Sequence, residues 1–286
     1  MEKIFQIDID DVLKRKLGKK YKWFPKSWIF FLKKLICQDE LNHFLANEGK
    51  DKTGLDFITS VLNDFLQIKL NVIGAENLPK NKKCTFACNH PMGSIDGLAF
   101  LKVIGEHYNG KVKLFLNSLL CEIPEIEKFA IPVNKFGRQN SQLRYIINDS
   151  FESENQVLIF PAGICSRKRG PKIRDNKWKK AFVQKSLDSK RDIVPVYFHG
   201  QNSKSYYRLA RFIEFFGIKA NIPMLFLVRE MLKCKGQTFT IVIGKSISHR
   251  VLNVFNKRHG LNHHELAEMI QTIVYELEKK VNQKSE

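Results

Sequence analysis

The 286-residue sequence lacks any long apolar run that would cross a membrane. No uncharged apolar segment approaches the ~20 residues that a transmembrane helix needs. The stretch that follows Met1 also has no apolar core of the kind found in signal peptides. We therefore expect a protein that is soluble or attached to a membrane only at its surface.

The cysteine patterns that are typical of disulfide frameworks and zinc sites are also missing. The six cysteines form no Cys-x-x-Cys pair, and no group of cysteines and histidines has the spacing of zinc ligands. Cys84 and Cys88 lie on one face of an expected strand, so we interpret them as small buried side chains. We expect a reducing compartment, no disulfides and no structural metal.

Carboxylates are scarce relative to cations. The chain has 29 Asp and Glu against 48 Lys and Arg, which gives a formal net charge of +19. Such an excess favours an anionic partner, such as a membrane surface, nucleic acid or an acidic carrier protein. A solvated basic surface accounts for part of such a charge as well. The sequence has no nucleic-acid-binding motif with interleaved aromatic residues, so we expect no nucleic acid partner.

The pattern that is present is that of an α/β protein. Short apolar runs alternate with helical periodicity through residues 68–286, which predicts a mostly parallel sheet flanked by helices. Strands are expected over residues 68–74, 84–88, 113–117, 129–133, 156–160, 192–198 and 239–244. Helices are expected after the 84–88 strand, over residues 141–152 and 178–187, and over residues 262–280.

Residues 1–67 predict a separate helical segment. The first 20 residues are short and charged, so we expect them to be only partly ordered. Residues 24–46 combine aromatic side chains such as Trp28 and Phe31 with a rim of lysines, which predicts an amphipathic helix. Residues 54–67 predict a second helix, and the two together would form an N-terminal amphipathic helical hairpin. The first helix could pack on the main domain, contact a membrane surface, or do both.

One stretch changes abruptly from a buried strand to a polar turn at Asn89 and His90. Pro91 cannot continue a sheet ladder, and Gly93 permits backbone angles that are closed to other residues. Asp96 follows at the start of a new helical pattern. A histidine whose Nδ1 proton is held by a carboxylate can use Nε2 as a general base. The alternative is a strand-end histidine beside an aspartate that only caps a helix.

A second motif, Phe160-Pro-Ala-Gly-Ile-Cys-Ser-Arg167, directly follows the strand over residues 156–160. If the strands are parallel, it lies at the same sheet edge as His90, where ligands collect in α/β proteins. A basic run continues through Lys168, Arg169, Lys172 and Arg174. Guanidinium groups pair well with carboxylate or phosphate, so this loop is a candidate anion pocket. The alternative is an exposed basic loop.

Arg138 is a third candidate, placed between the 129–133 strand and the helix that begins near Ser141. An anion there would meet both a side chain and a helix N-terminus. The alternative is an ordinary surface arginine.

Along the chain, the segments with His90, Arg138 and Phe160 follow one another in the order of the first three motifs of the lysophosphatidate-type glycerolipid acyltransferases, which they resemble. The sequence is most similar to the branch that acylates lyso-ornithine and lyso-glycine lipids, often labelled hemolysins. The resemblance covers roughly residues 70–250 and is strongest at Asn89-His90-Pro91-x-Gly93-x-x-Asp96-Gly97. The family motif usually has one residue fewer than the five that separate His90 from Asp96 here. We expect Gly93 to absorb the additional residue as a bulge.

The resemblance implies an O-acyltransferase without a metal or cofactor. His90 would remove the proton of the acceptor hydroxyl, Asp96 would orient His90, and the alkoxide would attack an acyl thioester. The co-substrate would be acyl carrier protein or coenzyme A carrying the acyl group. The implied partners are an acidic carrier protein, a lysolipid acceptor and the anionic surface of the inner membrane, at its cytoplasmic face. The implied substrate-binding residues are Asn89, Gly93, Arg138, Phe160, Pro161, Gly163, Ser166 and Arg167.

Two departures from the family pattern bear on the acceptor. Ala162 stands where the family has a glutamate, and Cys165 stands where the family has an arginine. In the family, that glutamate and that arginine help to bind glycerol phosphate. This favours a lyso-amino-acid lipid, whose single carboxylate would meet Arg167. The alternatives are a 1-acylglycerol-3-phosphate acyltransferase and, from another class, a non-catalytic basic membrane-binding protein.

Overall fold

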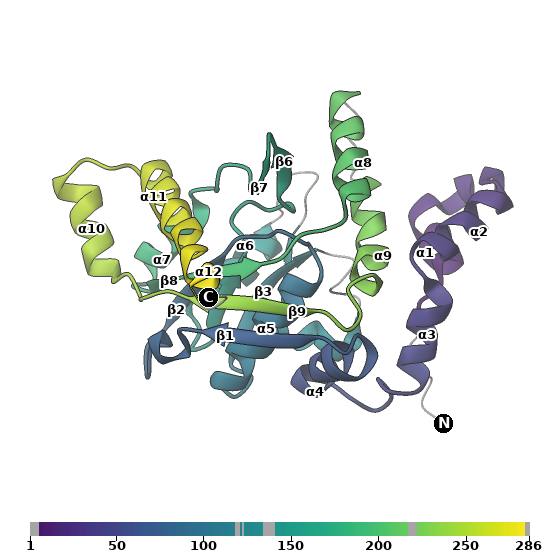
Figure 1. The fold of residues 1–286 in the computed structure, drawn as a ribbon, viewed down its shortest axis with the longest axis horizontal. Helices are drawn as coiled ribbons and strands as arrows, with labels where there is room; N and C mark the ends of the chain where they lie inside the picture. The colour runs from purple at the N-terminus through teal and green to yellow at the C-terminus, as the bar shows by residue number, and fades with distance from the viewer. Residues whose placement is uncertain (1–5, 118–120, 122, 134–140, 217–221, 284–286) are drawn as a thin grey trace.

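A seven-stranded sheet with the order β1-β9-β8-β2-β5-β3-β4 forms the centre of the protein (Figure 1). The computed structural model describes residues 6–117, 121, 123–133, 141–216 and 222–283. Within the described strands, β8 and β9 alone form an antiparallel pair in this sheet, so the predicted mostly parallel α/β fold is confirmed. The strands are β1 Lys69–Ile73, β2 Cys84–Cys88, β3 Val112–Asn117, β4 Ala130–Val133, β5 Gln156–Ile159, β8 Asp192–His199 and β9 Thr238–Ile243.

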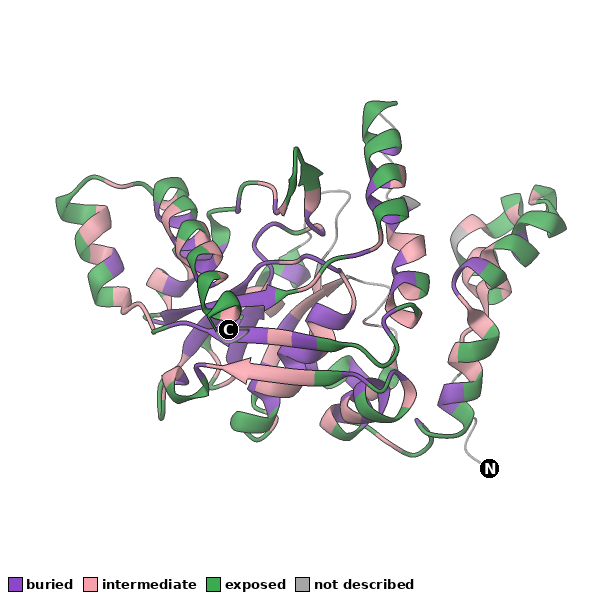
Figure 2. Cartoon of the chain, viewed as in Figure 1, coloured by how far each residue is buried: buried purple, intermediate pink, exposed green. Residues whose placement is uncertain are grey.

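Strand β2 lies in the middle of the sheet, and all of its residues are buried. Its side chains alternate between two cores, as expected for a sheet that is covered on both faces. Phe86 packs in the core shared with helix α5, whereas Ala87 packs in the core shared with α7 and α11. Cys84 and Cys88 are buried as predicted. Figure 2 shows the contrast between these central strands and the half-buried edge strand β1.

Helices cover both faces of the sheet. Among them, α5 Ile95–His107 starts directly after the turn that follows β2. The other helices of the body are α4 Gly54–Thr59 with its π-helical continuation Ser60–Phe65, α6 Ser141–Glu152, α7 Ala181–Asp188, α8 Lys204–Phe215, α9 Leu227–Leu232, α10 His249–Arg258, α11 His263–Glu276 and α12 Lys279–Asn282. A short antiparallel hairpin, β6 Arg167–Arg169 and β7 Lys172–Arg174, stands outside the main sheet.

The N-terminal segment differs from the sequence prediction in two respects. The single helix expected over residues 24–46 is two helices, α2 Lys26–Leu35 and α3 Gln38–Ala46, because Cys37 adopts a left-handed conformation with φ of 53°. The expectation of partial order is wrong for α1 Ile9–Leu17, a regular helix capped by the side chain of Asp8. The hairpin, and the division into 1–67 and 68–286, stay predictions. None of the described helices has both the length and the apolar character needed to cross a bilayer.

Candidate active site

The end of β2 and the first turn of α5 bring His90 and Asp96 into direct contact. The carboxylate Oδ2 of Asp96 lies 3.0 Å from Nδ1 of His90. Asp96 is fully buried, whereas the His90 side chain is 18% exposed. The contact between these two side chains is thus present in the structure, with five intervening residues. Because an ionised carboxylate only accepts hydrogen bonds, Nδ1 is the donor, which leaves Nε2 free of its proton in the neutral ring.

The surroundings of Asp96 keep its carboxyl ionised. Burial alone would raise its pKa, but the neighbouring His90 and the backbone N–H groups of Met92 and Gly93 lower it further than burial raises it. These two N–H groups donate to Oδ2 over 2.9 and 3.1 Å. The resulting pKa lies below the ordinary value of 3.8. The ionised Asp96 carboxylate is therefore an acceptor for the Nδ1 proton of His90.

Gly93 shapes the turn between these residues. Its φ is +79°, a conformation that side-chain-bearing residues rarely adopt. A Cβ atom at this position would lie 2.1 Å from Sγ of Cys165 and 2.9 Å from Cδ1 of Leu227. Only glycine fits both the backbone conformation and the space, so Gly93 allows the longer turn while the His90–Asp96 contact is retained.

The second motif lies beside the first because β5 is a parallel neighbour of β2. The ring of Phe160 stacks on the ring of His90, with centroids 4.0 Å apart and an interplanar angle of 24°. The backbone N–H of Ser166 donates to the carbonyl oxygen of His90 over 2.7 Å. Gly163 closes the intervening turn with a hydrogen bond from its N–H to the carbonyl of Phe160. The fold thus brings the two predicted motifs together.

A buried aspartate that the sequence analysis missed joins the two motifs. Oδ1 of Asp175 accepts hydrogen bonds from the backbone N–H of His90, at 3.2 Å, and from Oγ of Ser166, at 2.5 Å. Its Oδ2 accepts from Nε1 of Trp178 at 2.9 Å. Burial raises the pKa of Asp175, although these donors oppose the shift. No local pattern marks this residue, because it lies 85 positions from His90.

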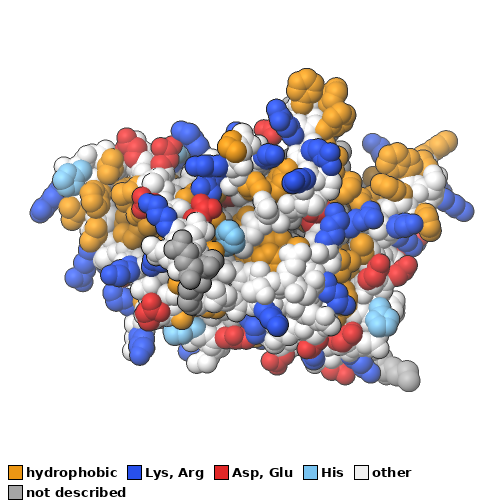
Figure 3. Space-filling model, viewed as in Figure 1, with side chains coloured by type: hydrophobic (Ala, Val, Ile, Leu, Met, Phe, Trp, Pro, Cys, Tyr) orange, Lys and Arg blue, Asp and Glu red, His pale blue; other side chains and the backbone are white. Residues whose placement is uncertain are grey.

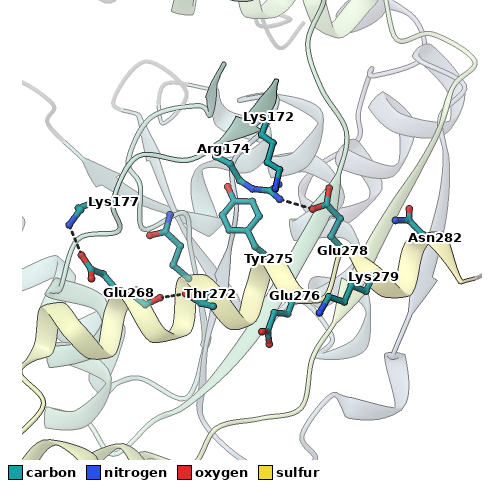
Figure 4. Close-up of a pocket in the computed structure, with 11 residues that line it drawn as sticks. Lys172, Arg174, Lys177, Glu268, Thr272, Tyr275, Glu276, Glu278, Lys279 and Asn282 are labelled. Carbon is teal, nitrogen blue, oxygen red and sulfur yellow. Dashed lines mark hydrogen bonds and ion pairs between the residues drawn. The ribbon is translucent and has the colours of Figure 1, made fainter. Parts of the chain in front are cut away.

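Helix α11 supports this aspartate from behind. The backbone N–H of Asp175 donates to the hydroxyl of Tyr275 over 2.7 Å. The guanidinium of Arg174 lies over the Tyr275 ring and pairs with Glu278 at 2.8 Å (Figure 4). Arg174 is one of the cations of the expected anion pocket, but in the structure it contacts Tyr275 and Glu278 of the same protein. These contacts run from Glu278 through Arg174 and Tyr275 to Asp175. They hold the Asp175 loop in place beside the backbone N–H of His90.

His90 opens into a large and mainly apolar cavity of about 1790 Å³. Its walls come from the sheet edge and from the N-terminal helices, including Leu32 of α2 and Phe44 of α3. This volume and lining suit a long acyl chain. The predicted residues that reach the cavity wall are His90, Gly93, Phe160, Pro161, Gly163 and Arg167.

The other predicted residues lie elsewhere. Asn89 is buried, and its amide bonds to both the N–H and the carbonyl of Phe198, which ties β2 to β8. Ser166 is buried against Asp175, and Arg138 lies outside the described residues. The substrate contacts assigned to all these residues stay predictions. In the part of the chain that the structure describes, no His, Cys, Asp or Glu side chains gather in threes as a metal site requires.

Comparison with known proteins identifies the family. A family model described as Acyltransferase matches residues 11–280. The chain belongs to this acyltransferase family. It is 46% identical over 246 residues to the lyso-glycine lipid O-acyltransferase of Phocaeicola vulgatus, covering 86% of this chain and 88% of the relative. It is 44% identical over 276 residues to the protein of the same name from Bacteroides thetaiotaomicron, covering 96% and 99%.

The fold of this acyltransferase also has a solved counterpart. The crystal structure of the 1-acyl-sn-glycerophosphate acyltransferase PlsC from Thermotoga maritima superimposes with a TM-score of 0.52 over 95% of this chain and 94% of that chain. The two sequences are 14% identical, so this similarity concerns the fold alone. The resemblance inferred from the motifs is confirmed, and the protein is an enzyme rather than a non-catalytic membrane-binding module.

Proposed function

We propose that this acyltransferase moves a fatty acyl group from an acyl thioester to the hydroxyl of a lyso-amino-acid lipid, with lyso-glycine lipid as the first candidate. The observation that carries the proposal is the free Nε2 side of an oriented histidine at the wall of a large apolar cavity. The names of the two bacterial relatives support the acceptor.

In the proposed reaction, Nε2 of His90 takes the proton of the acceptor hydroxyl as the oxygen attacks the thioester carbonyl. The tetrahedral intermediate then collapses, a new ester forms, and the carbon–sulfur bond breaks. The leaving thiolate takes the proton from the imidazolium, which restores the neutral ring. Asp96 holds the Nδ1 proton throughout and stabilises the imidazolium while it exists. Phe160 limits the tilt of the ring by stacking on it.

The acceptor carboxylate is assigned to Arg167. A phosphomonoester carries about two charges, and strong sites meet it with several cationic donors. Here Ala162 is buried against the core, and Cys165 is buried beside Gly93, so neither position offers a charge. Nη1 of Arg167 donates to the carbonyl of Cys165 at 2.9 Å, and the side chain lines the cavity. An arginine has five N–H donors, so this contact leaves donors for one carboxylate.

The donor and the location complete the proposal. Acyl carrier protein is acidic, which suits a chain of net charge +19, and coenzyme A is the alternative thioester carrier. We further propose that the enzyme is a peripheral protein on the cytoplasmic face of the inner membrane, since a lipid acceptor requires access to a membrane surface. Helix α2 supports this location, since Trp28, Phe30 and Phe31 are exposed on it beside Lys26 and Lys34.

A competition assay tests the acceptor. Lyso-glycine lipid and lysophosphatidate compete for one acyl-carrier donor, and we expect lyso-glycine lipid to be acylated preferentially. Arg167→Ala should raise KM for the amino-acid lipid by about tenfold, the scale of a lost charge-assisted hydrogen bond, with little change in KM for the donor. Arg169→Ala on the same hairpin is the control, since Arg169 is exposed and bonds to Asn176. A clear preference for lysophosphatidate would refute the acceptor assignment.

A further inference from the structure

Helix α8 ends in a cluster of exposed aromatic rings. The exposed fractions are 58% for Phe212, 83% for Phe215 and 59% for Phe216. The rings touch one another, with centroids 4.5 Å apart for Phe212 and Phe216 and 5.3 Å apart for Phe215 and Phe216. A single exposed apolar side chain is ordinary on a soluble protein, but a contiguous group of them marks an interaction site.

The same helix forms part of the wall of the catalytic cavity. Tyr206, Ala210 and Ile213 are buried on its inner face and line the cavity. The helix therefore runs from the cavity that contains His90 to an exposed apolar cluster at its C-terminal end. An element with these two surfaces suits an enzyme whose substrate is drawn from a lipid phase.

The C-terminal end of α8 and helix α2 lie in the same part of the view in Figure 1, although they are far apart in the sequence. Helix α8 rises above the level of β1 and β9, and α2 lies to its right, also above that level. Figure 3 shows hydrophobic side chains at both places, with Lys and Arg around them. Helix α8 carries three cations, Lys204, Arg208 and Arg211, against one carboxylate, Glu214. Its charge thus complements an anionic lipid surface rather than a basic partner.

We propose that the exposed aromatic cluster at the C-terminal end of α8 is a second membrane contact, in addition to α2. Phe212, Phe215 and Phe216 enter the interfacial region of the bilayer, and Arg208 and Arg211 meet anionic head groups. The cavity, which both helices help to line, then lies between two anchored points and faces the lipid. This inference rests on the proposed function, because a lipid acceptor is what makes a membrane the occupant of this surface.

Vesicle sedimentation tests the contact without any acyl transfer. The probe is phosphatidylcholine vesicles with and without phosphatidylglycerol. Phe212→Ser/Phe215→Ser should lower the partition coefficient by about tenfold or more, because two aromatic side chains no longer leave water. The matched control is Val251→Ser/Val254→Ser on α10, which removes two exposed apolar side chains at the opposite end of the molecule from α1–α3 (Figure 1).

A charge variant separates the two parts of the contact. Arg208→Glu/Arg211→Glu should weaken binding to vesicles that contain phosphatidylglycerol, and the loss should shrink as salt rises. Because binding is the readout, a failure of the proposed acyl transfer leaves this test intact. Wild-type vesicle binding by the Phe212→Ser/Phe215→Ser protein would overturn the proposal. So would the loss of a dimer in that variant by sedimentation velocity, which would make a second copy of the chain the occupant.

Discussion

At the scale of single residues, two histidine–aspartate pairs with similar N–O distances occur among the residues that the structure describes. His90 and Asp96 are 3.0 Å apart, and Nδ1 of His249 lies 2.8 Å from Oδ1 of Asp192. His90 stands at the cavity wall, whereas Asp192 begins β8 and so lies at the opposite end of the strands. The pairing alone therefore does not mark a catalytic group. What distinguishes His90 is its position at the carboxyl edge of the sheet.

Asp96 gives a prediction about stability and pH. Its pKa is lowered in the folded protein, so it binds fewer protons there than in the unfolded chain near pH 3.8. Its ionic contribution to the free energy of unfolding is fully present above that pH and declines as the pH falls through the lower, folded-state pKa. Asp96→Asn removes this contribution. The stability difference between wild type and variant should therefore be constant near neutral pH and shrink in acid.

Urea unfolding of both proteins at a series of pH values checks this expectation. The Asn side chain keeps the shape of Asp96 but has no charge to lose. A difference that widens as the solution is acidified would show that the folded-state pKa is raised instead.

At the scale of elements, the site depends on a glycine turn. Gly93→Ala should be strongly damaging, because it combines a left-handed backbone with a Cβ placed 2.1 Å from Sγ of Cys165. Gly110→Ala is the matched control, since its φ is +76° and nothing lies within 4 Å of the added atom. The left-handed backbone costs a residue with a Cβ atom about 1–2 kcal/mol, and this cost is common to both variants, so the excess loss at Gly93 measures the clash.

The measurements are the free energy of unfolding and kcat/KM of the two glycine variants. We expect Gly93→Ala to lose more of both than Gly110→Ala. Equal losses would mean that the close approach of Cys165 to Gly93 does not add to the cost of the substitution.

The elements that the sequence predicts well are those with a strong apolar pattern. The buried strand over residues 84–88 and the helix over residues 141–152 are found with the expected bounds. Helix α8 was missed because the exposed Phe212 and Phe215 add apolar residues outside its buried face, which obscures the helical spacing of Tyr206, Ala210 and Ile213. Ser203 caps the helix as a start signal would require. The β6–β7 hairpin was missed because nearly all residues of its two short strands are cationic, although Gly170 and Pro171 mark the turn between them.

In the candidate site, the residues on one short segment could be predicted, whereas those that depend on distant segments could not. His90 and Asp96 were predictable because they lie on one short segment, where the strand, the turn and the helix start are all visible in the sequence. The position of Phe160 followed from parallel strands ending at a common edge. Asp175 was not predictable, since its contacts to His90 and Tyr275 depend on segments that only the complete fold brings together. The hydrogen bonds between the side-chain amide of Asn89 and the backbone of Phe198 could not be predicted for the same reason.

At the scale of the whole molecule, the N-terminal helices complete the cavity that the sheet begins. Replacing Trp28 and Phe31 of α2 by Ser should weaken binding to anionic vesicles more than it lowers Tm, because both side chains are more than half exposed. Tyr145→Ser is the control, since Tyr145 of α6 is an aromatic residue with 71% exposure. A proportionate fall in vesicle binding and Tm would assign α2 to packing rather than to the membrane.

The most direct test of the catalytic claim compares two histidine variants in one acyl-transfer assay. His90→Ala should lower kcat by about 10²–10⁴-fold, the usual contribution of a positioned general base, with an unchanged fold. His249→Ala removes the other histidine–aspartate pair and should leave kcat near the wild-type value. Near-normal turnover by a folded His90→Ala protein, or an equal loss in both variants, would contradict the account.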